Sequence, residues 1–264
     1  MLSPVSTVTA LLAVAGFACS APAAAHGGGS IDALIQKRSF SCNNLVTGLN
    51  SGDCQWMSTI GMAGQGTNAV SNNGNIWIGG DGPNTFTFTN QASSPSNVPV
   101  TLILWDNPPN DYQSSFMNVR TPKISYSLPN VGNSVTISLA NGVSGGWAAL
   151  NNHATTISQY GQIYNTWGEF TTGSYATVDV SRLVNMGGNT MSVKVSTGCV
   201  SNMNTCVFTC YNGNTCGTSG SYQLVNCAAG SQPGASYGMY DGNPSGGCQG
   251  WSNGGHLDIS LGRF

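Results

Sequence analysis

The sequence predicts an all-β protein, an antiparallel β-sandwich that carries a disulfide-rich loop region. Three observations lead to this fold class. Short segments alternate apolar and polar residues with a period of two, as strands with one buried face do. Glycine, asparagine and proline separate these segments, as they do at turns. No window of ten or more residues carries a convincing apolar stripe with the 3.6-residue period of an amphipathic helix.

Seven segments are predicted as strands. They cover residues 84–90, 98–105, 123–128, 134–140, 175–181, 190–196 and 255–262. Cysteines are absent from residues 55–198 and crowd between 199 and 248, so we expect strand packing to build the core and disulfides to hold a loop-rich excursion. The last strand lies beyond this excursion and is expected to return to the sandwich, which makes one domain simpler than two.

The N-terminal segment has the features of a secretory leader. Residues 1–25 combine an apolar stretch with an alanine-rich end, which predicts a signal peptide. Residues 26–38 end in Lys37 and Arg38 and are predicted to be a pro-segment removed by a dibasic protease, as is common in fungal secretory proteins. The remaining domain spans 39–264. No later stretch reaches the roughly 18 apolar residues that cross a bilayer, so we expect a secreted, extracellular protein without a membrane anchor.

Cysteine number and spacing predict disulfides. Cys19 lies in the leader, and the eight that remain are Cys42, Cys54, Cys199, Cys206, Cys210, Cys216, Cys227 and Cys248. An even number in an exported chain indicates four bridges, with the first two cysteines closing an N-terminal loop and the other six paired among themselves in one of 15 ways. Zinc is the rival interpretation of CVFTC and CYNGNTC, but neither has the usual knuckle spacing. We expect no metal and no other cofactor.

The composition limits the partners. Charged residues make up 6 % of the chain and the formal net charge is -2, whereas soluble proteins average about 25 % charged residues. Such a chain has no field that attracts nucleic acid or an anionic membrane. We therefore expect neither as a partner, and we expect a monomer.

Two carboxylates stand close together in TWGEFTTGSYATVDVS, residues 166–181. Glu169 is the only glutamate of the chain, and Asp179 follows ten residues later. A three-residue hairpin turn at 172–174 would set Trp167 opposite Asp179 and place the two carboxylates diagonally on one sheet face, roughly 5 to 8 Å apart. That range overlaps the separations in retaining and inverting glycosidases. Neighbouring carboxylates also push their pKa values apart, which lets one act as general acid.

A purely structural role is the alternative for this pair, as polar residues on a solvated sheet face. Several aromatic residues near it in sequence could stack on sugar rings, although aromatic residues in strands are more often core. They are Trp105, Trp147, Tyr160, Tyr164 and Trp167.

Three segments resemble the thaumatin-like family, in the same order along residues 84–262. The segment TWGEFTTGSYATVDVSRLVNMGGNTM is similar to that family's A-E-F-T strand, turn, D-[IV]-S strand and acidic D-G-F-N loop. ASYGMYDGNPSGGCQGWSNGGHLDISL is similar to its S-Y-x-Y-D-D segment and final strand, and FTFTNQASSPSNVPVTLILWDN resembles its opening strand pair. The resemblance implies a sandwich with an acidic cleft that meets β-1,3-glucan, with endo-β-1,3-glucanase activity in some members.

The family's cleft has an arginine, a glutamate and three aspartates, of which the chain matches three. Glu169, Asp179 and Asp241 occupy matching positions and are the candidate catalytic residues. Asn185 replaces an acid of the D-G-F-N loop, and the arginine is absent from GGWAAL at 145–150. Asn185, Trp167 and Tyr164 are the candidate substrate-binding residues.

The resemblance therefore predicts a secreted thaumatin-like protein that binds β-1,3-glucan or another cell-wall polysaccharide. Weak endo-β-1,3-glucanase activity is left open, because the cleft lacks the arginine and one acid. A catalytically silent effector or wall component on the same scaffold is the alternative, favoured by the missing arginine and the change to asparagine. A copper site at His26 with His153 or His256 is a further alternative, which requires the pro-segment to be retained.

Overall fold

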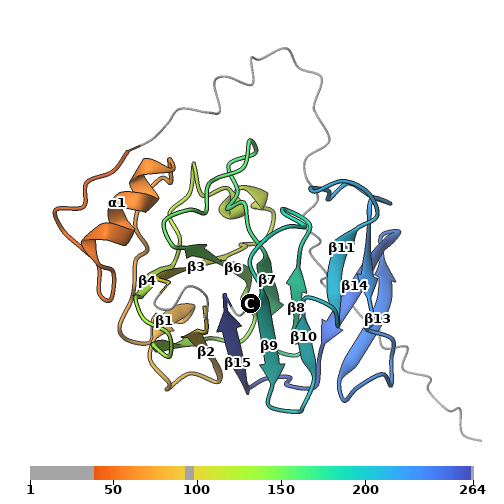
Figure 1. Ribbon diagram of the computed structural model, residues 1–264. Coiled ribbons are helices and arrows are strands. Elements are labelled where there is room, and N and C mark those ends of the chain that lie inside the picture. Colours follow the sequence, from red (N-terminus) through yellow and green to blue (C-terminus); the bar gives the residue numbers. More distant parts are fainter. Residues whose placement is uncertain (1–38, 93–97, 263–264) are drawn as a thin grey trace, which may run out of the picture.

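The computed structural model describes residues 39–92 and 98–262 (Figure 1). The predicted signal peptide, pro-segment and dibasic site lie outside these residues, as does His26 of the alternative copper site. All seven predicted segments are strands, with bounds within two residues of those expected.

One sheet has six strands. In spatial order these are β1 (Ile76–Ile78), β5 (Ser134–Leu139), β2 (Asn84–Asn90), β15 (Gly255–Leu261), β9 (Met191–Val195) and β10 (Val200–Asn202). The last strand of the chain thus lies between β2 and β9, which confirms that it returns to the sandwich. It pairs parallel to β2 from Gly255↔Asn84 to Leu261↔Asn90 and antiparallel to β9.

The other sheet has nine strands. Seven form a continuous path, which is β12 (Tyr222–Val225), β11 (Val207–Cys210), β8 (Thr177–Ser181), β7 (Trp167–Thr171), β6 (Ser144–Asn151), β3 (Val100–Asp106) and β4 (Ile124–Leu128). The hairpin of β13 (Ala235–Tyr240) and β14 (Asn243–Cys248) joins this sheet where Cys248 pairs with Val178 of β8. The predicted all-β sandwich is confirmed; most strand pairs are antiparallel, but β11 runs parallel to β8 and β15 parallel to β2, so both sheets are mixed.

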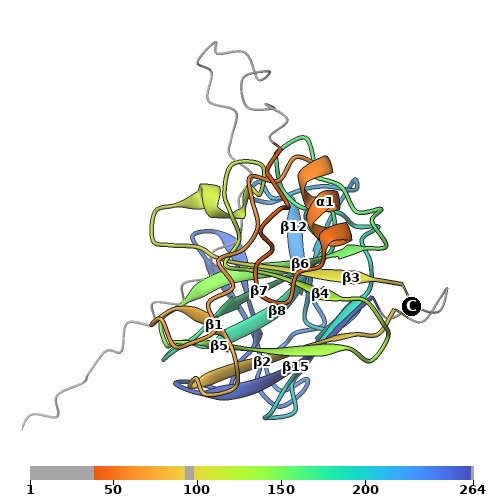
Figure 2. The ribbon, with the colours of Figure 1, turned by 90° about the vertical axis from the view of Figure 1, so that its left-hand side faces the viewer.

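The two sheets pack face to face as layers (Figure 2). Alternate residues of each strand point into this interface and form the larger core, including Phe86, Leu102, Trp147, Val178 and Ile259. Burying such side chains contributes about 1.5 to 3 kcal/mol each. The sandwich is therefore held by apolar packing across most of its length.

A second, smaller core covers the outer face of the nine-stranded sheet. Ile103 and Trp105 of β3 and Trp167 of β7 point to this face, where α1 (Ser51–Thr59) covers them with Cys54 and Met57. Asn50 caps α1 by accepting the Asp53 N–H at 2.8 Å. The only other helix in the described residues is the short η2 (Tyr112–Ser115), and none of the helices described is long and apolar enough to cross a membrane.

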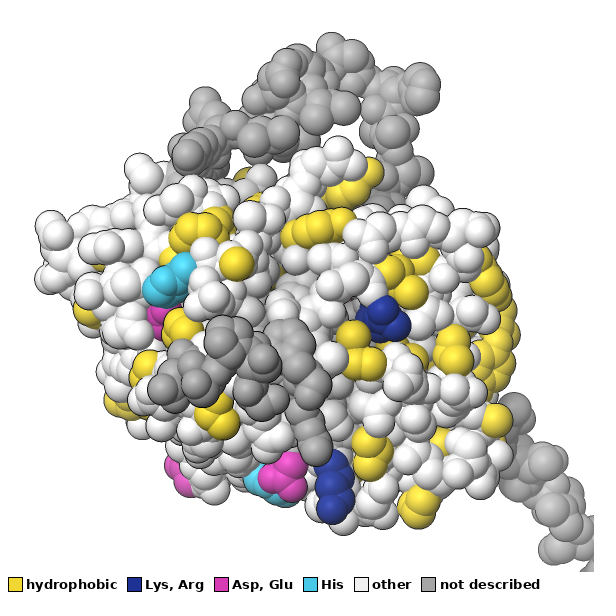
Figure 3. All heavy atoms as spheres, viewed as in Figure 1, with side chains coloured by type: hydrophobic (Ala, Val, Ile, Leu, Met, Phe, Trp, Pro, Cys, Tyr) yellow, Lys and Arg dark blue, Asp and Glu magenta, His cyan; other side chains and the backbone are white. Residues whose placement is uncertain are grey.

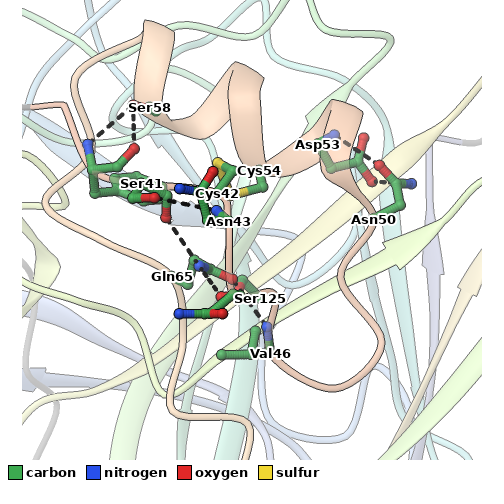
Figure 4. The surroundings of a disulfide bond; sticks show 12 residues. Ser41, Cys42, Asn43, Val46, Asn50, Asp53, Cys54, Ser58, Gln65 and Ser125 are labelled. Carbon is green, nitrogen blue, oxygen red and sulfur yellow. Dashed lines mark hydrogen bonds between the residues drawn. A yellow bond between two sulfur atoms is a disulfide. The ribbon is translucent and has the colours of Figure 1, made fainter.

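Four disulfides join the eight expected cysteines. Cys42 bonds to Cys54 and fixes the N-terminal segment to α1 (Figure 4), as predicted. The six later cysteines pair among themselves, as predicted, and the structure selects Cys199–Cys248, Cys206–Cys227 and Cys210–Cys216. The cysteine-rich region is more than a loop excursion, because it supplies β10 to one sheet and β11, β12 and the β13–β14 hairpin to the other.

Candidate functional site

The two candidate carboxylates face each other directly across adjacent strands. Glu169 of β7 pairs with Asp179 of β8, and on its other side Glu169 pairs with Gly146 of β6. The expected three-residue turn is wrong: the connecting loop covers 172–176, so the register is shifted by two residues. A shift of two keeps the side-chain face, and the expectation that both carboxylates share one face is confirmed.

Burial controls the protonation of this pair. Asp179 is 7 % exposed and its buried Oδ1 has no hydrogen-bond partner among the described residues, whereas Glu169 is half-buried. Burial raises the pKa of Glu169 to about 7, while a hydrogen bond from Ser181 acts in the opposite direction. Burial, and secondarily the charge of Glu169, raise the pKa of Asp179 well above its ordinary value. Both groups therefore favour the protonated form under weakly acidic conditions.

The surroundings of the pair leave little free space. A Cβ at Gly146 would lie 2.8 Å from Cζ2 of Trp105, so the indole occupies the space above this glycine beside Glu169. On the other side, a Cβ at Gly247 of β14 would lie 3.2 Å from Cβ of Asp179. Glycine at both positions lets the neighbouring elements close over the carboxyl pair.

Two of the sequence-predicted site residues do not join the pair. Trp167 is buried in the smaller core, edge to face with Trp105 at 4.8 Å between ring centroids, and it donates from Nε1 to the Ile163 carbonyl at 2.8 Å. It cannot stack on a sugar. Asp241 is exposed at the two-residue turn of the β13–β14 hairpin, where it and Gly242 have positive φ. This turn lies at the far end of the hairpin from Cys248, the residue that pairs beside Asp179.

The other two predicted residues, Tyr164 and Asn185, meet in a pocket of about 380 Å³. It lies where β6 ends, β7 begins and the chain leaves β8. Five of the described residues that line it are asparagines, and none of them is a lysine, an arginine or a carboxylate. The residues that line the pocket are Val98, Asn151, Asn152, Ala154, Thr155, Thr156, Tyr164, Asn165, Asn185, Gly187, Gly188 and Asn189. We call it the amide pocket.

Some of the asparagine side chains in the amide pocket are fixed by hydrogen bonds within the protein, and others are available to a ligand. Asn165 donates from Nδ2 to the Ala149 carbonyl at 2.8 Å and to Oδ1 of Asn151 at 3.1 Å. Its own Oδ1 accepts the Asn189 N–H at 2.6 Å. In contrast, the side-chain amides of Asn152 and Asn189 have no partner among the described residues. The pocket thus combines an ordered floor with amides that can donate to and accept from a ligand.

A disulfide-closed loop supports the two predicted residues. Within the Cys210–Cys216 loop, Asn214 donates from Nδ2 to Oη of Tyr164 at 2.7 Å and to Oδ1 of Asn185 at 3.2 Å. Sequence reasoning treated asparagines in general as residues of the turns between strands and did not single out Asn165, Asn189 or Asn214 as site residues. Their clustering at the ends of β6, β7 and β8 is visible only once the strand order is known.

A separate polar cluster tightens the contact of α1 with the sheet. Buried Asp53 accepts from Ser127 Oγ and from Asn50 Nδ2, and lies 2.7 Å from Nε2 of His153. Trp56 donates from Nε1 to the Thr155 carbonyl at 2.9 Å. These contacts hold the loop that carries one wall of the amide pocket.

The other candidate arrangements do not form a metal site in the described residues. His153 contacts Asp53, and His256 contacts Asp258 and Thr85. Three sulfur atoms lie within 4.8 Å of one another, those of Cys199, Cys206 and Cys248, but all three belong to disulfides. Disulfide sulfur has no thiolate to offer a metal.

Charge is scarce on the surface as well as in the sequence. Figure 3 shows one face, on which lysine, arginine and acidic side chains are few and scattered among neutral polar ones.

The comparisons with known proteins identify a family. A family model described as the Allergen Asp f 4-like domain matches residues 75–226, more than half of the chain. The match covers β1 to β12, including the carboxyl pair and the whole amide pocket. No curated protein matches the chain.

Proposed function

The chain belongs to the Asp f 4-like domain family, and from this and the geometry above we propose that it is a secreted protein that binds a neutral polysaccharide. The observation that carries the proposal is the amide pocket, which is large enough for a ligand and whose described lining residues include five asparagines and Tyr164 and no charged residue. The hydroxyl groups of a sugar both donate and accept hydrogen bonds, as side-chain amides do. An aromatic ring beside them offers a face for the apolar side of a sugar ring.

β-1,3-Glucan is the first candidate ligand. The resemblance of three segments to thaumatin-like proteins supports this choice, and so does the absence of charge, because this polymer is neutral. The ligand is placed in the amide pocket rather than in an acidic cleft, since Tyr164 and Asn185 meet there and Asp241 lies elsewhere.

We propose that the protein binds the polysaccharide without hydrolysing it, and the carboxyl pair supports this choice. Directly opposed residues have Cβ atoms about 4.5 to 5.5 Å apart, which is compatible with a retaining pair. Such a pair needs one ionised carboxylate, however, and burial raises both pKa values. Neither Glu169 nor Asp179 lines the amide pocket. The protein is then the catalytically silent scaffold, an effector or wall component.

Pull-down of the 39–264 chain on insoluble β-1,3-glucan tests the proposal. We expect binding that depends weakly on salt, because a neutral polymer is not held by charge. Asn185→Ala and Asn189→Ala should each weaken it about 5-fold or more, the loss of roughly 1 kcal/mol per hydrogen bond. Tyr175→Ala is the matched control, an exposed tyrosine outside the pocket.

Two results would overturn the proposal. One is failure to bind this and other neutral polysaccharides at low salt, and the other is unchanged binding by both asparagine variants. Release of sugar by wild type but not by Glu169→Gln would show instead that the carboxyl pair is catalytic.

A further inference from the structure

The amide pocket has a neighbour that shares one of its walls. A second pocket of about 320 Å³ is lined by Ile157, Ser158, Gln159, Tyr160, Tyr164 and Thr215. Tyr164 lines both pockets and therefore lies at their junction. As in the amide pocket, none of the described residues that line the second one is charged. Each volume is at the lower end of the range of small-molecule sites.

An ordered hairpin forms the outer wall of the second pocket. Ile157 bridges to Ile163, the Ser158 N–H donates to the Gln162 carbonyl at 2.7 Å, and the Tyr164 N–H donates to the Thr156 carbonyl at 2.9 Å. Tyr160 lies near the tip of this hairpin and is 48 % exposed. Its ring is therefore presented to solvent by a structured element.

The tip and the opposite wall are both anchored. The Asn118 N–H donates to the Gly161 carbonyl at 3.2 Å, which fixes the hairpin tip to the segment after η2. Thr215, on the other wall, donates from Oγ1 to the Val184 carbonyl at 3.0 Å. Asn214, next to it in the disulfide loop, holds Oη of Tyr164 and leaves the hydroxyl hydrogen free to donate.

We propose that the two pockets form one binding groove that takes an internal stretch of a linear neutral oligosaccharide, with Tyr164 at the junction and Tyr160 as the outer stacking platform. This inference rests on the proposed function and specifies its ligand as an extended chain instead of a single sugar. Amides on one side and an exposed tyrosine on the other give successive sugar units different contacts. Binding energy then accumulates as the chain becomes long enough to reach both.

Calorimetric titration with β-1,3-linked gluco-oligosaccharides of two to six units tests the groove. We expect the affinity to rise about 10-fold or more from the shortest oligomer to those that span both pockets, and then to level off. Tyr160→Ala should remove this gain and change the affinity for the shortest oligomer less than about 2-fold. Tyr160→Phe should restore the gain, because stacking needs the ring and not the hydroxyl.

Tyr175→Ala is the matched control, and thermal melting confirms that each variant is folded. Equal affinity for all lengths, or a length dependence unchanged in Tyr160→Ala, overturns the two-pocket groove while the proposed function stands. Absence of binding to every oligomer, to the polymer and to other neutral polysaccharides overturns the proposed function itself, so the two failures are distinguishable.

Discussion

At the scale of single residues, the opposed carboxyl groups of Glu169 and Asp179 place a free-energy cost on the folded state. A buried acceptor without a partner, such as Oδ1 of Asp179, costs about 1 to 3 kcal/mol. Protonation reduces this cost, which is why burial raises the pKa of both groups. The stability of the protein is therefore coupled to pH through this pair.

We expect the folded state to lose stability as the pH rises from about 4.5 toward 7 and above. The folded pKa of Glu169 is about 7 against an ordinary value of 4.5, so in this window the folded protein keeps a proton that the unfolded chain releases. Thermal melting at pH 5 and pH 8 should give the lower Tm at pH 8. Glu169→Gln should reduce the difference, and Asp258→Asn, at an exposed position, should not.

The same pair shows what residue spacing can and cannot predict. The period of two placed both carboxylates on one face, and this held although the predicted register was wrong. The register failed because Thr172 is not a free turn residue: its Oγ1 donates to the Ala140 carbonyl at 2.7 Å and accepts the Val143 N–H at 2.9 Å. A contact with a distant loop lengthened the turn, and local sequence carries no signal of it.

At the scale of elements, short disulfide-closed loops position residues that strands cannot. The loop between Cys210 and Cys216 brings Asn214 to Tyr164 and Asn185, and its backbone is tied to the chain after β8 by the Met186 N–H, which donates to the Asn214 carbonyl at 2.9 Å. The Cys210–Cys216 disulfide thus helps to fix the positions of Tyr164 and Asn185, which line the pockets.

Changing Cys210 and Cys216 together to serine should lower the free energy of unfolding by about 2 kcal/mol, from the chain entropy of so short a loop. It should also weaken glycan binding, because Asn214 is then held less firmly. Chemical denaturation and the pull-down measure the two effects. Asn214→Ala is the companion variant, expected to weaken binding with the disulfide intact. Unchanged binding in both variants would show that the loop does not support the groove.

Strands in which apolar and polar residues alternate could be predicted from the sequence, whereas a strand without this alternation, such as β14, could not. Segments such as 84–90 and 134–139 became strands as expected because every second residue enters the core. β14 has the sequence NPSGGC, which reads as a turn, yet it pairs with β13 along its whole length. Gly246 and Gly247 are required by close approach to the backbones of β13 and β8, where an added Cβ would overlap the Ser236 oxygen and lie 2.6 Å from the Val178 oxygen, and this is a property of the assembled sheet.

At the scale of the whole molecule, the sandwich is closed by its last strand. β15 lies inside the six-stranded sheet and pairs on one side with β2 and on the other with β9, while Leu257, Ile259 and Leu261 enter the larger core. The strand follows the family-matched region 75–226 in sequence. The region matched by the family model is therefore shorter than the part of the chain that forms the sandwich.

We predict that a fragment limited to residues 75–226 does not fold. Without β15 the strands β2 and β9 lose their common partner, which leaves two unpaired edges and an open core in the middle of the sheet. In the fragment, Cys199 and Cys206 also lose their partners, so both should be changed to serine to prevent false pairing. Circular dichroism melting and amide proton dispersion should show no cooperative unfolding and no dispersed spectrum. The 39–264 chain carrying the same cysteine changes is the control, because it separates the loss of two disulfides from the removal of α1, the β13–β14 hairpin and β15. A cooperative transition in the fragment would contradict the prediction and would mean that the sandwich can close between β2 and β9 without the strand that now separates them.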